Sequence, residues 1–218
     1  PALAPVAAQT MLPRSDAART TTQLCERLVA RDYQEIVTYS FVEPEWERDL
    51  AGNTAPVTLQ NPIAAHLSAM RSSLMGGLLS CLRYNLSRKQ ARVRVFEMGR
   101  VFHAANDGFD QPTYLAGLAY GSALPEQWGS AQRNVDFFDA KGDLEALLWP
   151  AAASFERATH PALHPGQSAR VMLDGVAIGW IGALHPKWAQ QYELPQAPML
   201  FELELSATLA SVLPKYSE

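Results

Sequence analysis

Residues Asn61 to Phe102 read NPIAAHLSAMRSSLMGGLLSCLRYNLSRKQARVRVFEMGRVF and decide the fold, because a proline-containing loop, an amphipathic helix and a charged strand follow one another in them. Ser72 or Ser73 can cap a helix that runs to about Arg88. Leucines recur there at every fourth residue, at Leu74, Leu78, Leu82 and Leu86. Such a stripe predicts a helix with one face packed on a core.

Strands are expected on both sides of this helix. Branched and aromatic residues predict a strand over Gln34 to Val42, and another is expected over Arg92 to Phe102, antiparallel to a partner over Tyr114 to Tyr120. Asp174-Gly175 is the strongest two-residue hairpin signal in the sequence. The other predicted strands are 56–60, 134–140, 168–173, 176–182 and 199–205, and the other predicted helices are 20–31, 44–50, 142–149 and 186–192. Strands outnumber helices and the connections are short, so we predict an α+β fold, a mainly antiparallel sheet flanked by helices.

Composition restricts the class of protein. The chain has 218 residues, of which 48% are hydrophobic, and this is enough for one substantial domain or two small ones. Its net charge of -4 lacks the overall basic footprint of an autonomous nucleic-acid binder, and its two cysteines fit a reducing cytosol. No apolar run reaches the ~18 residues of a membrane span, so we expect a cytoplasmic chain without membrane contact.

Three segments are expected along the chain. Pro1, Pro5 and Pro13 disfavour a helix, so residues 1–19 are predicted to form an extended arm or linker. Residues 20–210 are predicted to form the core domain, and residues 211–218 the start of a linker to a following domain. The sequence is therefore expected to be a fragment of a longer chain.

Two adjacent glycines, Gly76 and Gly77, lie inside the predicted helix, where each costs about 1 kcal/mol relative to alanine. Glycine at such positions indicates that space is short. The neighbour that needs the space is either a helix of a partner chain or this domain's own sheet, and the sequence does not choose between them.

A local excess of positive charge follows the helix. Six basic residues lie within eighteen positions, opposed only by Glu97: Arg83, Arg88, Lys89, Arg92, Arg94 and Arg100. They either contact RNA phosphates or an acidic partner, or they form solvated helix and strand ends. Solvated ends need no ligand, because positive charge at the end of a helix already suits its dipole.

The carboxylate of Glu97 shares the strand phase of Val93 and Val95, so it is expected on the same side as apolar neighbours. Buried charges are generally paired. We therefore predict a structural ion pair with Arg71 or Arg100, in preference to a catalytic acid or base.

Metal and nucleophile motifs do not occur in the sequence. His160 and His164 in HPALHP have a tempting spacing, and His185 also precedes a proline, but Pro161 and Pro165 disfavour the helix that would bring two histidines onto one metal ion. No GxSxG and no GxxxxGK[ST] is present. We predict no metal site, and histidines that form turns and hydrogen bonds.

Five segments, in order, resemble the core of the β chain of phenylalanyl-tRNA synthetase. They are QEIVTYSFV, NPIAAHLSAMRSSLMGGLLSCLRYNLSRK, RVRVFEMGRVF, LHPGQSARV and DGVAIGWIGALHP, and together they cover most of Gln34 to Leu205. The resemblance implies a class II synthetase-like fold that has lost its ATP chemistry. It also implies packing against a catalytic α chain in an (αβ)2 assembly, with ATP, magnesium and tRNA bound by the complete enzyme and no cofactor in this fragment.

The class II motifs are altered here. Residues 61–79 resemble motif 1, the dimer-interface motif. The motif 2 strand has Arg94 two residues before Phe96, where the family pattern is F-R-x-E, and the glycines that could match motif 3 lack its following arginine. The resemblance thus implies that the arginines that clamp ATP phosphates are missing, and with them the preorganised cations that catalysis requires.

Three functional hypotheses remain. The leading one is a noncatalytic scaffold, with its subunit interface expected at Pro62, Leu74, Gly76, Gly77 and Leu78. The first rival is a free-standing adenylate-forming enzyme that uses Glu97, Arg71 and Arg94. The second rival is a tRNA-binding module that uses the basic stretch from Arg83 to Arg100, in which Arg83, Arg88, Lys89 and Arg92 are the candidate RNA or partner contacts.

Overall fold

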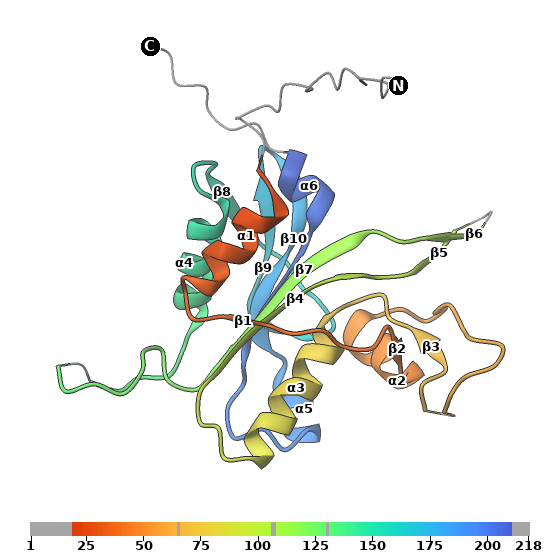
Figure 1. The fold of residues 1–218 in the computed structure, drawn as a ribbon, viewed down its shortest axis with the longest axis horizontal. Helices are drawn as coiled ribbons and strands as arrows, with labels where there is room; N and C mark the ends of the chain where they lie inside the picture. Colours follow the sequence, from red (N-terminus) through yellow and green to blue (C-terminus); the bar gives the residue numbers. More distant parts are fainter. Residues whose placement is uncertain (1–18, 65, 106–107, 130, 211–218) are drawn as a thin grey trace, which may run out of the picture.

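One large mixed sheet organises the computed structural model, which describes residues 19–64, 66–105, 108–129 and 131–210 (Figure 1). Its seven strands lie in the order β1-β4-β7-β11-β10-β9-β8, and every neighbouring pair is antiparallel except β1 and β4. The strands are β1 (Gln34–Glu35), β4 (Val93–Arg100), β7 (Thr113–Tyr120), β8 (Ala153–Arg157), β9 (Leu163–Leu173), β10 (Val176–Leu184) and β11 (Met199–Glu204). The predicted α+β class, a mainly antiparallel sheet flanked by helices, is confirmed.

Two short ribbons stand beside this sheet. One pairs β2 (Phe41–Val42) with β3 (Ala69–Met70), and the other pairs β5 (His103–Ala105) with β6 (Gly108–Asp110). The helices are α1 (Thr21–Val29), α2 (Pro44–Trp46), α3 (Met75–Ser87), α4 (Phe137–Leu148), α5 (Pro186–Gln191) and α6 (Leu205–Ala210), with a π-helical segment η1 (Glu47–Ala51) after α2. None of these helices is both long and apolar enough to span a membrane.

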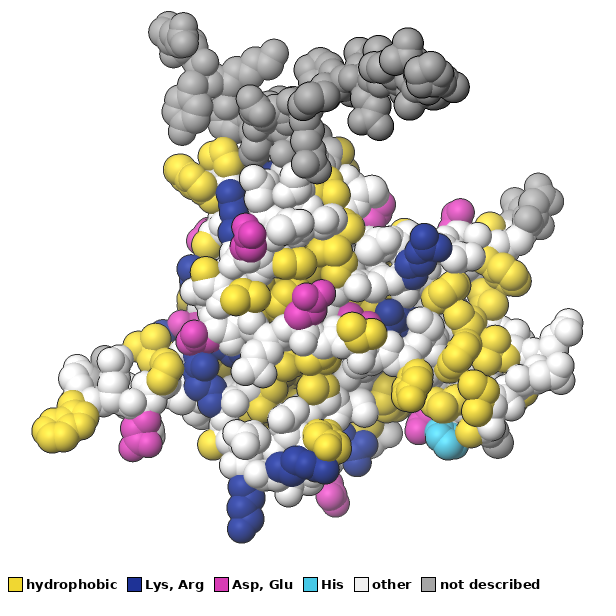
Figure 2. Space-filling model, in the orientation of Figure 1, with side chains coloured by type: hydrophobic (Ala, Val, Ile, Leu, Met, Phe, Trp, Pro, Cys, Tyr) yellow, Lys and Arg dark blue, Asp and Glu magenta, His cyan; other side chains and the backbone are white. Residues whose placement is uncertain are grey.

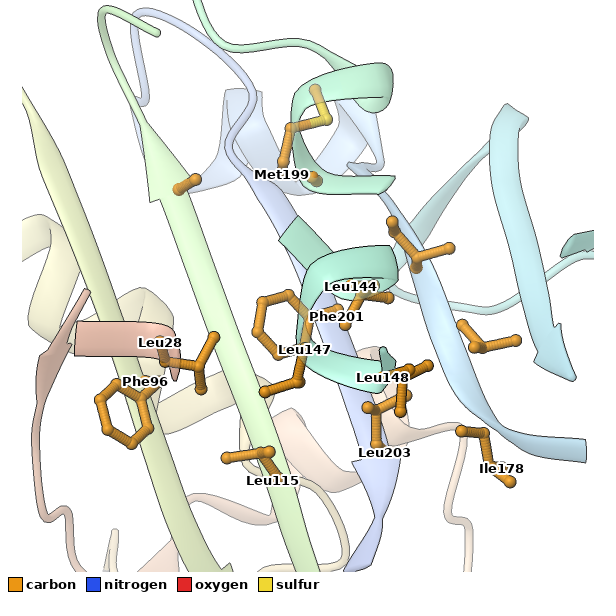
Figure 3. Packing of buried hydrophobic residues seen from close by; sticks show 14 of the residues in the cluster. Leu28, Phe96, Leu115, Leu144, Leu147, Leu148, Ile178, Met199, Phe201 and Leu203 are labelled. Carbon is orange, nitrogen blue, oxygen red and sulfur yellow. The ribbon is translucent and has the colours of Figure 1, made fainter. Parts of the chain in front are cut away.

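The core has two parts, one on each face of the sheet. Side chains of α1, α4 and α6 pack on one face, where Phe96, Phe201 and Leu203 point toward them (Figure 3). Side chains of α3 and α5 pack on the other face with Val95 and Leu200. Neighbouring residues of a strand face opposite sides, so Leu200 and Phe201 serve different parts of the core.

Polar caps position the helices of the first face. Thr20 and Gln23 form a reciprocal capping box at the start of α1, and Asp136 and Asp139 form one at the start of α4. The capping box at Asp136 explains one wrong prediction: residues 134–140 were expected to form a strand, but α4 begins at Phe137. Ahead of it, Asn134 makes only an isolated bridge to Ser122.

The predicted strand over Gln34 to Val42 is also wrong in its middle. Only its two ends pair, as β1 and β2, while Val37 and Tyr39 are 89% and 78% exposed. Thr38 explains the break, because its N–H and hydroxyl bind the carboxylate of Glu97 at 3.3 and 2.7 Å rather than a neighbouring strand. Residues 56–60 likewise form only one bridge, from Thr58 to Ala69.

The helix with the leucine stripe is α3, and it begins later than predicted. Its N-cap is Leu74, and neither Ser72 nor Ser73 takes that role. Both hydroxyls bind buried carboxylates: Ser72 binds Glu47, and Ser73 donates to Glu202 at 2.9 Å while it accepts from the N–H of Met75 at 3.1 Å. The predicted stripe is present, since Leu74, Leu78 and Leu82 are fully buried and Leu86 packs against the same cluster.

The flanking segments lie largely outside the described residues. Of the predicted arm 1–19, the structure describes only Arg19, and it describes none of the predicted linker 211–218. Arg19 is buried, and its guanidinium donates to the carbonyls of Leu148 and Thr208. The last residue assigned to the arm is thus packed against α4 and α6.

Candidate functional site

A buried ion pair ties the segment after β1 to the sheet. Arg71 Nη1 lies 2.7 Å from Glu97 Oε1, with 4% and 1% of the two side chains exposed. Thr38 Oγ1 donates to Glu97 Oε2 at 2.7 Å and accepts from Arg71 Nη1 at 3.0 Å, while Arg71 Nε donates to the carbonyl of Arg100 at 3.0 Å. The pair that the sequence predicts is therefore present, and it is also hydrogen-bonded to Thr38 and to the carbonyl of Arg100.

The third residue of the suggested adenylate-forming site lies on the other face. Arg94 Nη1 pairs with Asp143 Oδ2 at 2.8 Å, and only 7% and 5% of these side chains are exposed. Asp143 also pairs with Arg31 at 2.6 Å and accepts from the hydroxyl of Tyr33 at 2.8 Å. Arg71, Glu97 and Arg94 therefore do not converge on one site, because residues 94 and 97 are an odd number of positions apart on β4.

The two glycines of α3 face neighbours from within this chain. A Cβ atom at Gly76 would lie 2.5 Å from Cε3 of Trp46, and one at Gly77 would lie 2.4 Å from Oγ1 of Thr38. Such distances are well inside van der Waals contact, so the close approach of α2 and of the Thr38 segment accounts for both glycines.

The residues of the predicted subunit interface are divided between interior and surface. Leu74, Gly76 and Leu78 are buried, and both leucine side chains belong to the core between α3 and the sheet. Pro62 is exposed and Gly77 is half-buried. Within the described residues, direct contact with another chain is open to Pro62 and Gly77 but not to the other three.

The basic residues between 83 and 100 do not form one patch. Arg83 lies 5.5 Å from the centre of the Tyr192 ring, Arg88 lies 3.3 Å from that of Tyr84, and Arg92 pairs with Asp32 at 3.2 Å. Arg94 is committed to the opposite face of the sheet, and Arg100 bonds Gln111 at 3.4 Å. What remains near the end of α3 is a smaller exposed group, Arg83, Arg88 and Lys89.

A polar hollow of about 390 Å³ lies on the sheet beyond the start of α3. Its lining includes Ser73, Tyr114, His160, Arg170, Trp180 and Glu202, which come from four strands and two loops. Among them, only His160 and the candidate helix cap Ser73 stand out in the sequence. Arg170 and Glu202 could also have indicated this site from the sequence. They are charged residues in strand patterns that are otherwise apolar, and a charge at such a position often marks a functional or structural site.

The three proline-adjacent histidines form turns. The Nδ1 atoms of His160, His164 and His185 accept hydrogen bonds from the backbone N–H two residues on, at 3.2, 2.9 and 3.1 Å. In the part of the chain that the structure describes, no group of three or more His, Cys, Asp or Glu residues is placed to hold a metal ion.

Burial perturbs several acid–base groups of the hollow. Burial raises the pKa of Glu202 to about 7, although the hydrogen bonds from Leu74 and Ser73 act in the opposite direction. Burial, together with the charges of Glu202 and Glu204, raises the pKa of Tyr114 to about 12. Burial and the positive charge of Arg170 lower the pKa of His160 to about 4, so this imidazole is neutral at pH 7.

A second, apolar feature is a groove between α3 and the segment after β1, with a volume of about 820 Å³. We call it the α3 groove; its lining includes Val37, Tyr39, Trp46, Gly77, Cys81 and Tyr84. Three of these side chains are unusually exposed, Val37 at 89%, Tyr39 at 78% and Tyr84 at 59%. Hydrophobic side chains also gather on the neighbouring surface over α2, β2 and β3 (Figure 2).

The fold is that of class II aminoacyl-tRNA synthetases. The structure is similar to PylSc, a pyrrolysyl tRNA synthetase of Desulfitobacterium hafniense, with a TM-score of 0.63 and 12% sequence identity, over 86% of this chain and 66% of that one. At this identity the likeness concerns the architecture alone.

The sequence defines the family more narrowly. The family model "Phenylalanyl tRNA synthetase beta chain CLM domain" matches residues 1–205, so the chain belongs to this family. It is 55% identical to the phenylalanine–tRNA ligase beta subunit of Ralstonia nicotianae, over all of this chain and 28% of that protein. It is 54% identical to that of Cupriavidus pinatubonensis, over 98% of this chain and 27% of that protein. The chain thus spans little more than a quarter of these relatives, and the resemblance stated from the sequence is confirmed.

Proposed function

We propose that this chain is the noncatalytic core of a phenylalanyl-tRNA synthetase β chain. It supports the ATP-dependent attachment of phenylalanine to its tRNA by packing against the catalytic α chain in an (αβ)2 assembly in the cytoplasm. ATP and magnesium act elsewhere in that assembly, and tRNA is bound by the complete enzyme.

The α3 groove is the observation that best supports this role. Large β-branched and aromatic side chains rarely stay exposed together on a monomer, and contiguous apolar surface marks interaction sites. Val37, Tyr39 and Tyr84 meet this description. Because the relatives that match the whole chain are beta subunits, the partner that we assign to this surface is the α chain.

Two of the residues predicted for the interface from sequence are accessible to a partner. Gly77 lines the groove, and Pro62 is exposed in the loop that precedes β3. The buried residues Leu74, Gly76 and Leu78 contribute indirectly, since they seat α3 on the sheet and so position the surface that docks.

The pairing of the arginines supports a noncatalytic role. Transfer of a nucleotidyl group requires cations that are preorganised around the developing charge. Arg71 and Arg94 are already paired with Glu97 and Asp143 inside the protein. Neither guanidinium is therefore available to a nucleotide without breaking a buried ion pair, which costs about 3–5 kcal/mol.

Co-purification with the α chain tests the proposal. Val37→Asp and Tyr39→Asp place a charge in the α3 groove and should abolish co-elution of the two chains, because an unpaired carboxylate would be desolvated on docking. Val176→Asp is the matched control, since Val176 is 58% exposed next to the β9–β10 turn and lines no part of the groove. Thermal unfolding of each variant alone separates loss of assembly from loss of fold. Assembly that withstands both groove substitutions would refute the proposal.

Contact of tRNA with Arg83, Arg88 and Lys89 stays a prediction. These three residues are exposed near the end of α3, but two of them already lie on the rings of Tyr192 and Tyr84.

A further inference from the structure

Opposite charges lie in one row across the face of the sheet that forms the polar hollow. Arg170 on β9 is paired in register with Trp180 on β10, and Trp180 is paired with Glu202 on β11. Residues paired in this way project from the same face. Arg170 and Glu202 are therefore two strand spacings apart, roughly 10 Å between Cα atoms, with the indole of Trp180 between them.

The guanidinium of Arg170 has no anionic partner among the described residues. It lies 3.9 Å from the centre of the Trp180 ring, and neither a hydrogen bond nor an ion pair to any part of the described chain accompanies this contact. The carboxylates on the same face, Glu202 and Glu204 of the hollow and Glu156 opposite Arg170 on β8, make no ion pair with it within the described residues. A cation that is half-buried and stacked but unpaired is prepared for an anion from outside.

Glu202 offers the complementary group. Within the described residues, both of its hydrogen bonds end on Oε1, from the Ser73 hydroxyl at 2.9 Å and the Leu74 N–H at 2.7 Å. These bonds fix the carboxyl group and leave Oε2 without a donor, although the side chain is only 5% exposed and lines the hollow. Tyr114 and Glu204 line the same side.

His160 adds a neutral donor on the side of Arg170. Its ring lies 5.0 Å from that of Trp180. Nδ1 accepts from the N–H of Ala162, so the proton of the neutral imidazole is on Nε2. Since burial holds this histidine neutral at pH 7, it can donate to an anion but adds no charge of its own.

We propose that the hollow binds a small zwitterion of the α-amino acid class, with its carboxylate on Arg170 and its ammonium group on Glu202. An α-amino acid that makes one hydrogen bond of about 2.8 Å at each end bridges the gap that keeps Arg170 and Glu202 apart. A volume of about 390 Å³ suits a ligand of this size, since small-molecule pockets start near ~300 Å³. Trp180 and Ile178 supply apolar surface for a side chain. Binding here is independent of docking at the α3 groove.

Isothermal titration of the chain with L-leucine and with L-serine tests the assignment. At least one of them should bind saturably with a Kd of about 1 mM or below. Arg170→Gln and Glu202→Gln should each weaken that binding at least about tenfold. Glutamine at 202 keeps an acceptor for Ser73 and Leu74, so this variant is expected to stay folded.

Matched controls keep the test specific. Glu26→Gln in α1 and Arg157→Gln in β8 change exposed residues outside the hollow, and they should leave binding unchanged. For leucine, 3-methylbutylamine lacks the carboxylate and 4-methylpentanoate lacks the ammonium group, so both should bind at least tenfold more weakly. The proposal is overturned if neither amino acid binds, if both hollow variants bind like the parent chain, or if either analogue binds as tightly as leucine.

Discussion

Gly77→Ala is expected to destabilise the fold although alanine is the better helix former. The added methyl group would lie 2.4 Å from Oγ1 of Thr38. Thr38 cannot yield easily, because this hydroxyl donates to Glu97 at 2.7 Å and accepts from Arg71 at 3.0 Å within a buried ion pair. The substitution must displace either α3 or the Thr38 segment.

The size of the effect follows from three contributions. Overpacking costs about 1–3 kcal/mol, and weakening a hydrogen bond to a charged group costs about 1.5–3 kcal/mol. Helix propensity returns about 1 kcal/mol. The expected net loss for Gly77→Ala is roughly 1.5–5 kcal/mol, which lowers the Tm of a chain of this size by roughly 3–20 °C.

Gly142→Ala is the matched control for the same exchange in another helix. No atom lies within 4 Å of a Cβ at Gly142 in α4, so this variant should gain about 0.5–1 kcal/mol from helix propensity alone. Urea unfolding of the two variants and the parent chain, followed by circular dichroism, measures both changes in the absence of any partner. If Gly77→Ala unfolds at the parent midpoint, the close contact with Thr38 is not what requires glycine there.

Three further substitutions test other parts of the structure. Glu202→Gln should remove one contribution to the pH dependence of the free energy of unfolding. Burial raises the pKa of Glu202 to about 7 from 4.5, so the folded chain holds this proton more tightly than the unfolded chain. The parent chain therefore loses stability as the pH rises from about 4.5 to 7. The variant should therefore be more stable by up to ~3 kcal/mol at about pH 8, and urea midpoints that fall equally with pH in both proteins would contradict this. Asp143→Ala strands the buried Arg94 and should cost about 3–5 kcal/mol, against about 0.5 kcal/mol or less for Glu145→Ala in an exposed pair of the same helix; equal unfolding free energies would exclude the structural role of that ion pair. Thr20→Ala removes the cap of α1 and should cost about 1 kcal/mol in the same assay, with an unchanged midpoint as the contrary result.

Local patterns in the sequence were sufficient for several features of the fold. The leucine stripe of α3 depends on helical periodicity, and the turn at Asp174-Gly175 depends on backbone conformations that a short polar residue and a glycine adopt readily, as their positive φ angles of 51° and 77° show. The pairing of Glu97 followed from its position in an apolar strand phase. These features are decided by residues close together in the chain. The five segments that resemble the synthetase β chain, taken in their order along the sequence, were likewise sufficient to recognise the family.

The sites depended on contacts between distant residues. The sequence showed that space is short at Gly76 and Gly77, but the neighbours Trp46 and Thr38 are thirty or more positions away, so only the folded chain identifies them. The polar hollow escaped the sequence analysis for the same reason, since its lining comes from strands that become neighbours only in the sheet.

The sequence by itself determined the family, the fold class, the main helix and the need of Glu97 for a partner. These features depend on helical periodicity, on turn residues and on the position of a charge within the alternating pattern of a strand, all of which act over short distances along the chain. Only the tertiary structure decided that Arg94 is directed away from Arg71 and that Arg170 and Glu202 share one hollow. The order and register of the strands determine which of these side chains share a face of the sheet. Strand order and register in turn depend on how the whole chain packs the two parts of its core against a single sheet.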